Sequence, residues 1–567
     1  SIDVMDANEY RAFIKDIWGE ESDAYRALGT ANTDWQDEIM RTAISHDHNV
    51  TLSGSFKNLP YRASVGYTDQ QGIIKTSEFQ RVTASLNLNP TFFDEHLTMN
   101  LNAKGMYSRS QYADGEAISD AIVFDPTQDP YDYTSDFHNA MFNKYDEEHG
   151  YPVGTTLATT WENMGHYFEW PMAGAYNDDT WPYTYNNLAQ KNPLAILNEK
   201  HNVAHSRAFI GSADVDYKVH GFEDLRLHMT LGADISKGRQ QTNTTQSSPQ
   251  AIYYGSYGAD EILKRNLSLN AYAQYYKDFN KNHHFDIMGG YEWQHFHQEG
   301  SYDGYGLYPS TNTEKPGQQT EHKLTEWKTE NYLVSFFGRA NYSLLDRYLL
   351  TATVRYDGSS RFKDHWALFP SFAFGWKIKE EAFLKDVEEL SDLKLRLGYG
   401  QTGQQEGIGN YNYFASYNVN QTPDSFYPII GNGQLNRPDA YNSDLTWETT
   451  TTYNVGLDFG FVNNRITGSL DYYFRETTDL LNTVYVPAGA NFRNQVTSNI
   501  GSLENTGFEA SLNVKPIVSD DWYWDLGFNL TYNKNEITEL IGEEGYYVAT
   551  GGISSGTGNT CQAHAVG

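Results

Sequence analysis

Strict alternation of apolar and polar side chains, sustained over unusually long runs, is the feature that most constrains this chain. Residues 453–461 place Tyr, Val, Leu and Phe at every second position, with Asn, Gly and Asp between them. After a turn at Asn463 and Asn464, the same alternation resumes over residues 466–475. Because successive side chains of a strand point to opposite faces, this pattern predicts an antiparallel hairpin with one apolar and one polar face.

The runs are too long for ordinary globular strands. Comparable alternation covers residues 285–294, 334–344, 348–356 and 522–533. Runs of about 10 to 15 residues exceed the 5 or 6 of a typical globular strand, whereas crossing a bilayer takes about 9 to 11. The second face is small and polar, which suits a water-filled lumen better than the core of a soluble β-sandwich. We therefore predict an all-β fold, a large transmembrane antiparallel β-barrel.

The connections between these runs alternate between short and long, as they do in transmembrane barrels. The short ones are Pro90–His96, His220–Asp224, Asn280–His283, Leu345–Arg347, Val462–Asn464 and Ser519–Asp521. The long ones are Arg109–Val203, Lys237–Leu263, Gln298–Asn331, Thr402–Thr446 and Thr477–Leu503. The runs predict about sixteen strands in up-and-down order. Residues 1–48 are expected to form a first outer loop with a short helix, and residues 49–567 the barrel strands with long extracellular loops.

Composition agrees with this class and argues against others. Aromatic residues make up 15% of the chain, with 43 Tyr and 12 Trp, which fits the aromatic girdles of a membrane barrel. The mean hydropathy of -0.64 would suit a soluble protein, but the alternating faces of a barrel also average out as polar. A formal net charge of -32 argues against nucleic acid as a partner. The single cysteine, Cys561, excludes an internal disulfide and a cysteine-based zinc site.

Several segments carry a more specific resemblance. They are similar to signatures of the SusC/RagA-like TonB-dependent transporters and occur in the expected order along the chain: VMDANEY at 4–10, NTDW at 32–35, VRYDGSSRF at 354–362, FPS at 369–371, GW at 375–376, LKLRLGYGQTGQ at 393–404 and NIGSLENTGFE at 499–509. The chain is therefore identified as a member of that family of outer-membrane transporters.

The resemblance implies a 22-stranded barrel, of which this chain would supply sixteen strands, with one before Ser1 and five after Gly567. It also implies an N-terminal plug and a TonB box outside this chain, and import energised through TonB. Family members pair with a SusD-like surface lipoprotein, and the resemblance suggests a dimer of such pairs in outer-membrane lipid. The implied cargo is an oligosaccharide, of the fructan type by overall resemblance, with oligopeptides as the alternative within the family.

The loop Arg109–Val203 is the most informative candidate for substrate contact. Aromatic planes beside carboxylates match sugar rings, because the rings present apolar faces edged by hydroxyl groups. The loop interleaves acidic residues with aromatic ones, and the predicted substrate-binding residues are Trp161, Tyr167, Trp170, Trp181 and Tyr183. The alternative is that these aromatics pack the loop against the barrel rim or against a lid protein.

Metal sites and cofactors find little support in the sequence. His46, Asp47 and His48 lie in a predicted strand, where neighbours point to opposite faces and do not converge easily. The acids of the long loop lack the alternate-ligand spacing of a known calcium loop; they are Asp132, Asp136, Asp146, Glu147 and Glu148. We predict no metal site and no cofactor.

Catalysis is not expected either. The chain contains no Gly-x-Ser-x-Gly elbow, no His-Glu-x-x-His pair and no phosphate-binding Gly-Lys motif. The acid pairs 380–381 and 388–389 fall on a segment, Glu380–Leu390, that is predicted to be a solvated periplasmic helix. An outer-membrane hydrolase stays possible, because catalytic triads converge only in space. A passive porin or an adhesin would also be compatible with a membrane barrel.

Overall fold

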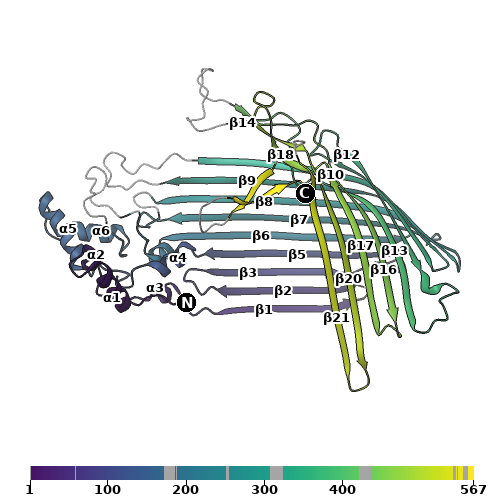
Figure 1. Ribbon diagram of the computed structural model, residues 1–567, viewed down its shortest axis with the longest axis horizontal. Coiled ribbons are helices and arrows are strands. Elements are labelled where there is room, and N and C mark those ends of the chain that lie inside the picture. Colours follow the sequence, from purple (N-terminus) through teal and green to yellow (C-terminus); the bar gives the residue numbers. More distant parts are fainter. Residues whose placement is uncertain are drawn as a thin grey trace.

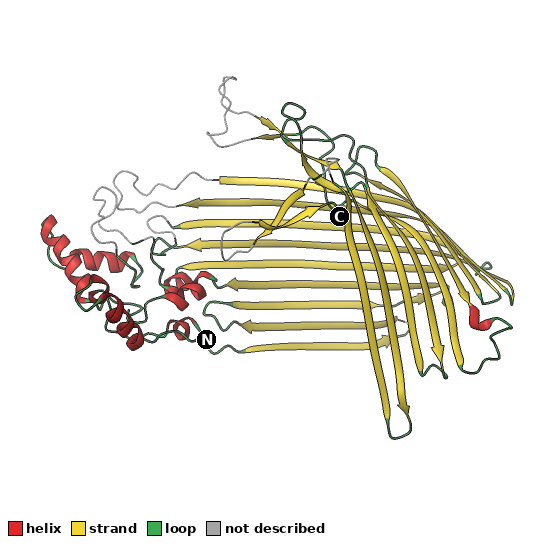
Figure 2. Cartoon of the chain, viewed as in Figure 1, coloured by secondary structure: helices red, strands yellow, loops and turns green. Residues whose placement is uncertain are grey.

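A computed structural model describes residues 2–57, 59–171, 186, 188–250, 255–306, 323–419, 436–540, 545, 547–552 and 560–567. Strands dominate the described residues, and most of the helices gather at one end of the molecule (Figure 2). None of the helices in these residues combines the length and the apolar character needed to cross a membrane.

The main sheet is an antiparallel meander in which each long strand pairs with the next long strand along the chain (Figure 1). Its long strands are β1 (Ser45–Phe56), β2 (Leu59–Gln71), β3 (Glu78–Leu88), β5 (Leu97–Tyr112), β6 (Lys200–Lys218), β7 (Leu225–Thr244), β8 (Ser256–Asn280), β9 (His283–Gly306), β10 (Lys323–Leu344), β11 (Tyr348–Ser359), β12 (Trp366–Lys377), β13 (Leu390–Gln404), β16 (Glu448–Phe461), β17 (Ile466–Thr478), β20 (Ser502–Val518) and β21 (Tyr523–Glu539). The short β4 (Thr91–Phe92) pairs with β5. The predicted all-β class and the up-and-down order are therefore confirmed.

The connections place the described α-helices and small hairpins on one side. The helices are α1 (Ala7–Trp18), α2 (Asp23–Arg26), α3 (Trp35–Ile39), α4 (Glu116–Val123), α5 (Asp136–His149), α6 (Thr155–Asn163) and α7 (Pro193–Asn198). The hairpins are β14 (Tyr417–Val419) with β15 (Asn436–Pro438), β18 (Leu481–Tyr485) with β19 (Gln495–Asn499), and β22 (Tyr547–Gly552) with β23 (Thr560–Ala565). We call this side the long-loop end and the opposite side the short-turn end.

Tight turns at the short-turn end use non-glycine residues in the left-handed region. Leu345 and Asp346 have φ values of 57° and 53° between β10 and β11. The same conformation recurs at Asn463 and Asn464, with φ values of 53° and 60° between β16 and β17. Asn and Asp tolerate this region better than most residues, which explains the polar composition of these predicted turns.

Several strands are longer than their alternating runs predict. β8 has 25 residues and β9 has 24, and their pairing continues to Ser256 and Gly306. The added residues lie at the long-loop end, where both faces carry polar side chains. Alternation marks only the part of a strand that has one apolar face. Sequence periodicity therefore underestimates the length of a strand that continues beyond the membrane.

The helix predicted for Glu380–Leu390 is not formed, and this prediction was wrong. The segment contains a single 3-10 turn, η1 (Ile378–Glu380), followed by turns that lead into β13. The ammonium group of Lys379 donates hydrogen bonds to the carbonyl oxygens of Leu384 at 2.9 Å and Val387 at 2.7 Å. The Leu384 carbonyl also accepts a hydrogen bond of 3.1 Å from the Val387 amide, so the segment closes as a series of tight turns and not as an α-helix.

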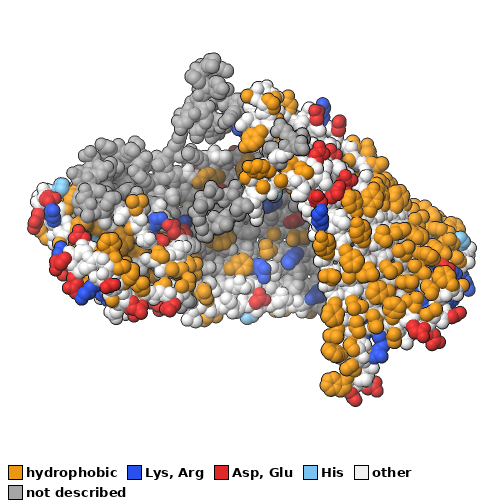
Figure 3. Space-filling view, in the orientation of Figure 1, with side chains coloured by type: hydrophobic (Ala, Val, Ile, Leu, Met, Phe, Trp, Pro, Cys, Tyr) orange, Lys and Arg blue, Asp and Glu red, His pale blue; other side chains and the backbone are white. Residues whose placement is uncertain are grey.

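The two faces of the sheet differ in chemistry, and we call them the outer face and the lumen face. Leu368, Phe372 and Leu530 on the outer face expose 57%, 53% and 63% of their surface. Figure 3 shows apolar side chains spread over the visible face of β16, β17, β20 and β21. On the lumen face, the Arg396 guanidinium donates hydrogen bonds of 2.9 Å to Asp458 and to Asp471. The apolar and polar faces predicted from the alternation are both present.

Candidate functional site

The long-loop end carries a compact helical unit built from two separate stretches of chain, residues 2–44 and the described part of 113–199, which we call the cap. Its core joins side chains of both stretches: Trp35, Ile39, Ala117, Ala121, Phe124, Tyr133, Phe142, Tyr167, Phe168 and Leu194–Leu197. The Trp35 indole donates a hydrogen bond of 2.9 Å to the carbonyl oxygen of Asp125. Gly29 allows close approach, because a Cβ there would lie 2.2 Å from the Thr127 carbonyl oxygen.

Local sequence signals explain where the cap helices begin. Asp6 and Glu9 form a reciprocal capping box at the start of α1, within the opening segment that carries the family resemblance. Asn192 caps α7 by accepting hydrogen bonds from the amides of Leu194 and Ala195, and Pro193 occupies the first helical position. These caps fix the ends of short helices, which would be marginal without them.

A buried carboxyl group joins the middle of the long loop to the start of α7. Glu169 is 1% exposed and accepts hydrogen bonds of 3.1 and 3.2 Å from the amide of Asn192. The Asn192 side-chain amide donates to the carbonyl oxygens of Pro130 and Phe168. Burial raises the pKa of Glu169 well above its usual value, because the ionised form loses its hydration. This polar centre fixes Phe168 and α7 relative to each other.

Two of the five acids of the long loop accept hydrogen bonds from backbone amides. Asp146 is fully buried and accepts hydrogen bonds of 2.8 Å from the Gly154 amide and 3.1 Å from the Thr156 amide, at the start of α6. Asp132 accepts from the amide of Tyr133. Among the described residues, these acids do not converge with others on a common point.

An exposed aromatic surface lies where the sequence places two of its predicted binding residues. Trp161 is 38% exposed, and its ring stacks on His166 with centroids 4.2 Å apart. Its indole nitrogen donates a hydrogen bond of 2.6 Å to the carbonyl oxygen of Tyr131, which is 49% exposed. Tyr167 lies behind Tyr131 at 5.7 Å and is 8% exposed. We call Tyr131, Trp161, His166 and Tyr167 the aromatic ledge.

The remaining predicted binding residues have different surroundings. Trp170 packs against the cap core, with its ring 5.2 Å from Phe168, 5.7 Å from His138 and 6.1 Å from Phe124. Trp181 and Tyr183 lie outside the described residues. Sequence reasoning missed Tyr131, because its role in the ledge depends on a contact with a residue thirty positions away.

A second cluster closes over the lumen face near the long-loop end. It contains Phe362, Phe369, Ile408, Leu445 and Trp447, and Leu333 of β10 packs against it. Ile408, Leu445 and Trp447, from the described parts of the connection between β13 and β16, therefore pack over the upper strands.

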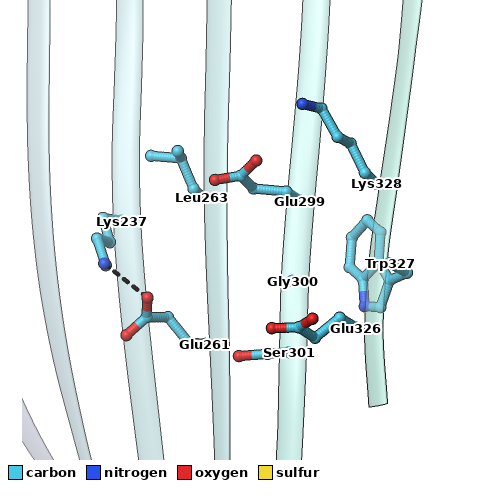
Figure 4. A pocket seen from close by; sticks show the side chains of 9 residues that line it. All are labelled: Lys237, Glu261, Leu263, Glu299, Gly300, Ser301, Glu326, Trp327 and Lys328. Atoms are coloured by element: carbon cyan, nitrogen blue, oxygen red, sulfur yellow. Dashed lines mark ion pairs between the residues drawn. The ribbon is translucent and has the colours of Figure 1, made fainter.

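Charged side chains form a shallow pocket across β7 to β10, beyond the apolar part of the wall (Figure 4). Lys237 and Glu261 form an ion pair of 2.6 Å within it. Glu299 and Lys328 face each other on β9 and β10. Trp327 covers Gly300, where a Cβ would lie 2.7 Å from the indole ring. The pocket is thus lined mainly by charged side chains, with Trp327 as its aromatic member.

The histidines of β1 behave as strand alternation predicts. The rings of His46 and His48 lie on one face with centroids 5.1 Å apart. The carboxylate of Asp47, on the opposite face, accepts a hydrogen bond from the hydroxyl of Thr68. The three side chains do not converge.

The chain matches known proteins along its whole length. The family model described as TonB dependent receptor-like, beta-barrel matches residues 201–559. The TonB-dependent receptor SusC of Bacteroides thetaiotaomicron is 49% identical, with 100% of this chain and 54% of that protein covered. The TonB-dependent receptor P3 of Formosa agariphila is 29% identical, with 95% of this chain and 50% of that protein covered. The chain thus spans about half the length of the curated relatives it matches.

Solved structures agree on the fold. The RagAB peptide transporter superposes with a TM-score of 0.68 at 22% identity, covering 95% of this chain and 59% of that chain. The same complex in its open-open state superposes with a TM-score of 0.67 at 23% identity, covering 95% of this chain and 56% of that chain. At this identity the likeness concerns the architecture of the barrel.

Proposed function

Because this chain belongs to the TonB-dependent receptors, whose β-barrel crosses the outer membrane with its strands, we propose that it forms the channel wall of an importer for oligosaccharides. In this proposal the long-loop end is extracellular, and the cap and ledge meet the cargo first. Transport is energised through TonB, by parts of the protein outside this chain. The relatives named above are receptors rather than enzymes, so the hydrolase alternative receives no support.

The aromatic ledge is the observation that carries the choice of sugar. Tyr131 and Trp161 offer exposed aromatic surface, and the backbone hydrogen bond from the Trp161 indole holds that ring in place. A pre-positioned aromatic plane loses little conformational entropy on binding, and it matches the apolar face of a sugar ring. His166, stacked on Trp161, adds a polar ring edge that can bind a hydroxyl group.

The proposed partner is a SusD-like surface lipoprotein that covers the long-loop end, with two such pairs forming a dimer. The cap supports this proposal because it presents a folded surface rather than loose loops, held by the buried Glu169 and Asn192. Pre-organised surfaces bind partners with a smaller ordering cost. A lipoprotein seated there would enclose cargo between itself and the ledge.

An oligopeptide is the second candidate cargo. The RagAB complex is a peptide transporter, and its barrel shares the architecture of this chain. That shared architecture is what supports this cargo, because the charged pocket at Lys237, Glu261 and Glu299 lies on the outer face of the wall. Among the sugars, fructan is the one to test first.

The test is calorimetric titration of the intact transporter, purified with its lipoprotein, against fructan, α-glucan, mannan and a mixture of oligopeptides. We expect saturable binding of one glycan. Trp161→Ala should weaken that binding at least about tenfold, since a well-packed Trp contact is worth more than about 1.4 kcal/mol.

Trp522→Ala is the matched control, because Trp522 is 73% exposed but lies at the short-turn end. It should bind the glycan with unchanged affinity. Binding of peptides alone would replace the sugar proposal with the peptide one. Glycan binding that is insensitive to Trp161→Ala would keep the cargo and remove the ledge from the binding site.

A further inference from the structure

Two histidines and a glutamate meet on the outer face of β9 and β10, next to the rings of Trp293 and Tyr332. His295 and His297 share a face of β9, and Glu330 lies directly opposite His297 on β10. His295 stacks on Tyr332 with ring centroids 4.2 Å apart and an interplanar angle of 8°. Trp293 also contacts Tyr332, with ring centroids 6.2 Å apart, so aromatic rings adjoin the cluster on one side.

The ligand atoms of the three residues are close enough to share one cation. The His295 Nε2 atom lies 3.1 Å from Glu330 Oε2, and the His297 Nδ1 atom lies 3.5 Å from the same oxygen. All three ligand atoms lie within 4.8 Å of one another. Ligands about 2.0–2.1 Å from a tetrahedral zinc ion stand roughly 3.3 Å apart, so a small adjustment of the side chains completes the site.

The two ring nitrogens of His297 have different surroundings. Both imidazoles are only 6% exposed, and the Nδ1 atom of His297 is buried without a hydrogen bond. Its other nitrogen, Nε2, lies 3.2 Å from the carboxylate of Glu299. Metal-binding histidines are commonly held in this way, with the non-coordinating nitrogen donating to a carboxylate. Glu299 therefore orients His297 so that Nδ1 faces Glu330.

We propose that His295, His297 and Glu330 bind a divalent first-row transition cation, with zinc as the best match, and that Glu299 is a positioning residue. Two imidazoles and one carboxylate form a common ligand set for zinc with an open fourth position. A water molecule would complete the coordination there. Arg265 and Lys328 are the neighbouring cations, and they lie directly opposite His297 and Glu299 in the strand register.

This site was not found from the sequence, and the transported cargo plays no part in it. His295 and His297 show the alternate spacing of a strand, but Glu330 is far along the chain and only the pairing of β9 with β10 brings it near. By contrast His46 and His48 have the same spacing, and no third ligand is brought within the same 4.8 Å among the described residues.

The experiment uses the intact transporter, stripped of metal with a chelator and titrated with zinc chloride at neutral pH. We expect one high-affinity zinc ion per transporter that the double variant His295→Ala/His297→Ala does not bind. Single variants at His295, His297 or Glu330 should weaken binding at least about tenfold, and Glu299→Gln should weaken it by about 10- to 100-fold. Cobalt absorption bands of a four-coordinate site, lost in the double variant, give a readout that mere packing would not produce.

His205→Ala is the control, because His205 pairs with Tyr107 on β5 and β6 outside the cluster. It should bind zinc as the parent protein does. Each variant is first shown to retain the heat-resistant compact barrel on gel electrophoresis. Absence of saturable zinc binding in the parent, or equal binding by the folded double variant, would overturn the proposal and leave a shared hydrogen-bond cluster.

Discussion

The cap and the barrel wall bury their apolar side chains in different media. In the cap, Phe142 and Phe168 are at most 1% exposed and are surrounded by side chains of the protein. In the wall, Phe372 and Leu530 expose more than half of their surface on the outer face, where lipid covers them. The cap therefore depends on close packing, whereas the wall depends on the difference between lipid and water.

Polar groups show the same contrast. In the wall, pairing between neighbouring strands satisfies the backbone amides and carbonyls. Its side chains are therefore not needed for that purpose and can alternate between apolar and polar. The cap has little sheet, and it relies on individual buried side chains such as Glu169, Asn192 and Asp146 to satisfy loops. A single substitution should thus damage the cap through lost contacts, and damage the wall only when it places a charge in lipid.

The largest effect is expected from a substitution that disrupts the packing of the cap core. Phe168→Ala removes a fully buried ring that lies 4.9 Å from Tyr133 and 5.2 Å from Trp170. We expect the free energy of opening the cap to fall by about 3–5 kcal/mol. Hydrogen exchange of cap peptides in the intact transporter measures this energy. Phe372→Ala is the wall control, and it should change exchange in neither region by more than about 1 kcal/mol, because lipid fills the space.

A pH titration probes the buried polar groups of the cap. His138 is 4% exposed, and burial lowers its pKa from 6.5 to about 4. The unfolded cap takes up this proton first, so stability should fall between pH 6.5 and about 4 and remain constant below that range. At about 1.4 kcal/mol for each pH unit, the loss is on the order of 3 kcal/mol.

Glu169 works in the opposite direction, because its raised pKa favours the folded cap at low pH. The measurement is therefore made in a Glu169→Gln background, following hydrogen exchange of the cap between pH 4 and 7.5. Replacing His138 by Gln in that background should remove most of the pH dependence. If cap stability depended on pH equally with and without His138, the pH dependence would belong to other groups.

A smaller effect is expected from a charge on the wall. Val455 lies on the outer face of β16 with 49% of its surface exposed, and Asn454 beside it lies on the lumen face. Val455→Arg should destabilise the barrel by about 2 kcal/mol, whereas Asn454→Arg should be nearly neutral in a wet lumen. Urea unfolding of the intact protein in lipid vesicles compares the two. Equal losses would show that both faces meet the same medium.

The smallest effect concerns the edge of the cap. Asp6→Ala removes the side chain that accepts hydrogen bonds from the amides of Asn8 and Glu9 at the start of α1. We expect a loss of about 1 kcal/mol, confined to peptides of α1 in hydrogen exchange. Asp6→Asn should retain most of the stability, because Asn caps nearly as well as Asp.

The sequence predicted the structure best in the strands, where the side-chain pattern repeats every two residues. The strands β16 and β17 and their Asn463-Asn464 turn follow directly from alternation, because the period of a strand does not depend on distant residues. It failed at Glu380–Leu390, where a helix-like composition lost to hydrogen bonds from Lys379. Trp170, one of the predicted binding residues, packs against the cap core, a contact that the sequence pattern alone could not show.

The sequence by itself determined that the chain forms a barrel wall with a polar lumen, that its connections alternate in length, and that it resembles SusC-like transporters. Only the tertiary structure decided which residues converge: Trp161 with the carbonyl of Tyr131, and His297 with Glu330. The physical reason is the range of the forces involved. Alternation reflects each residue's own preference for lipid or water, whereas a site requires side chains from distant segments, whose meeting depends on strand register and loop packing.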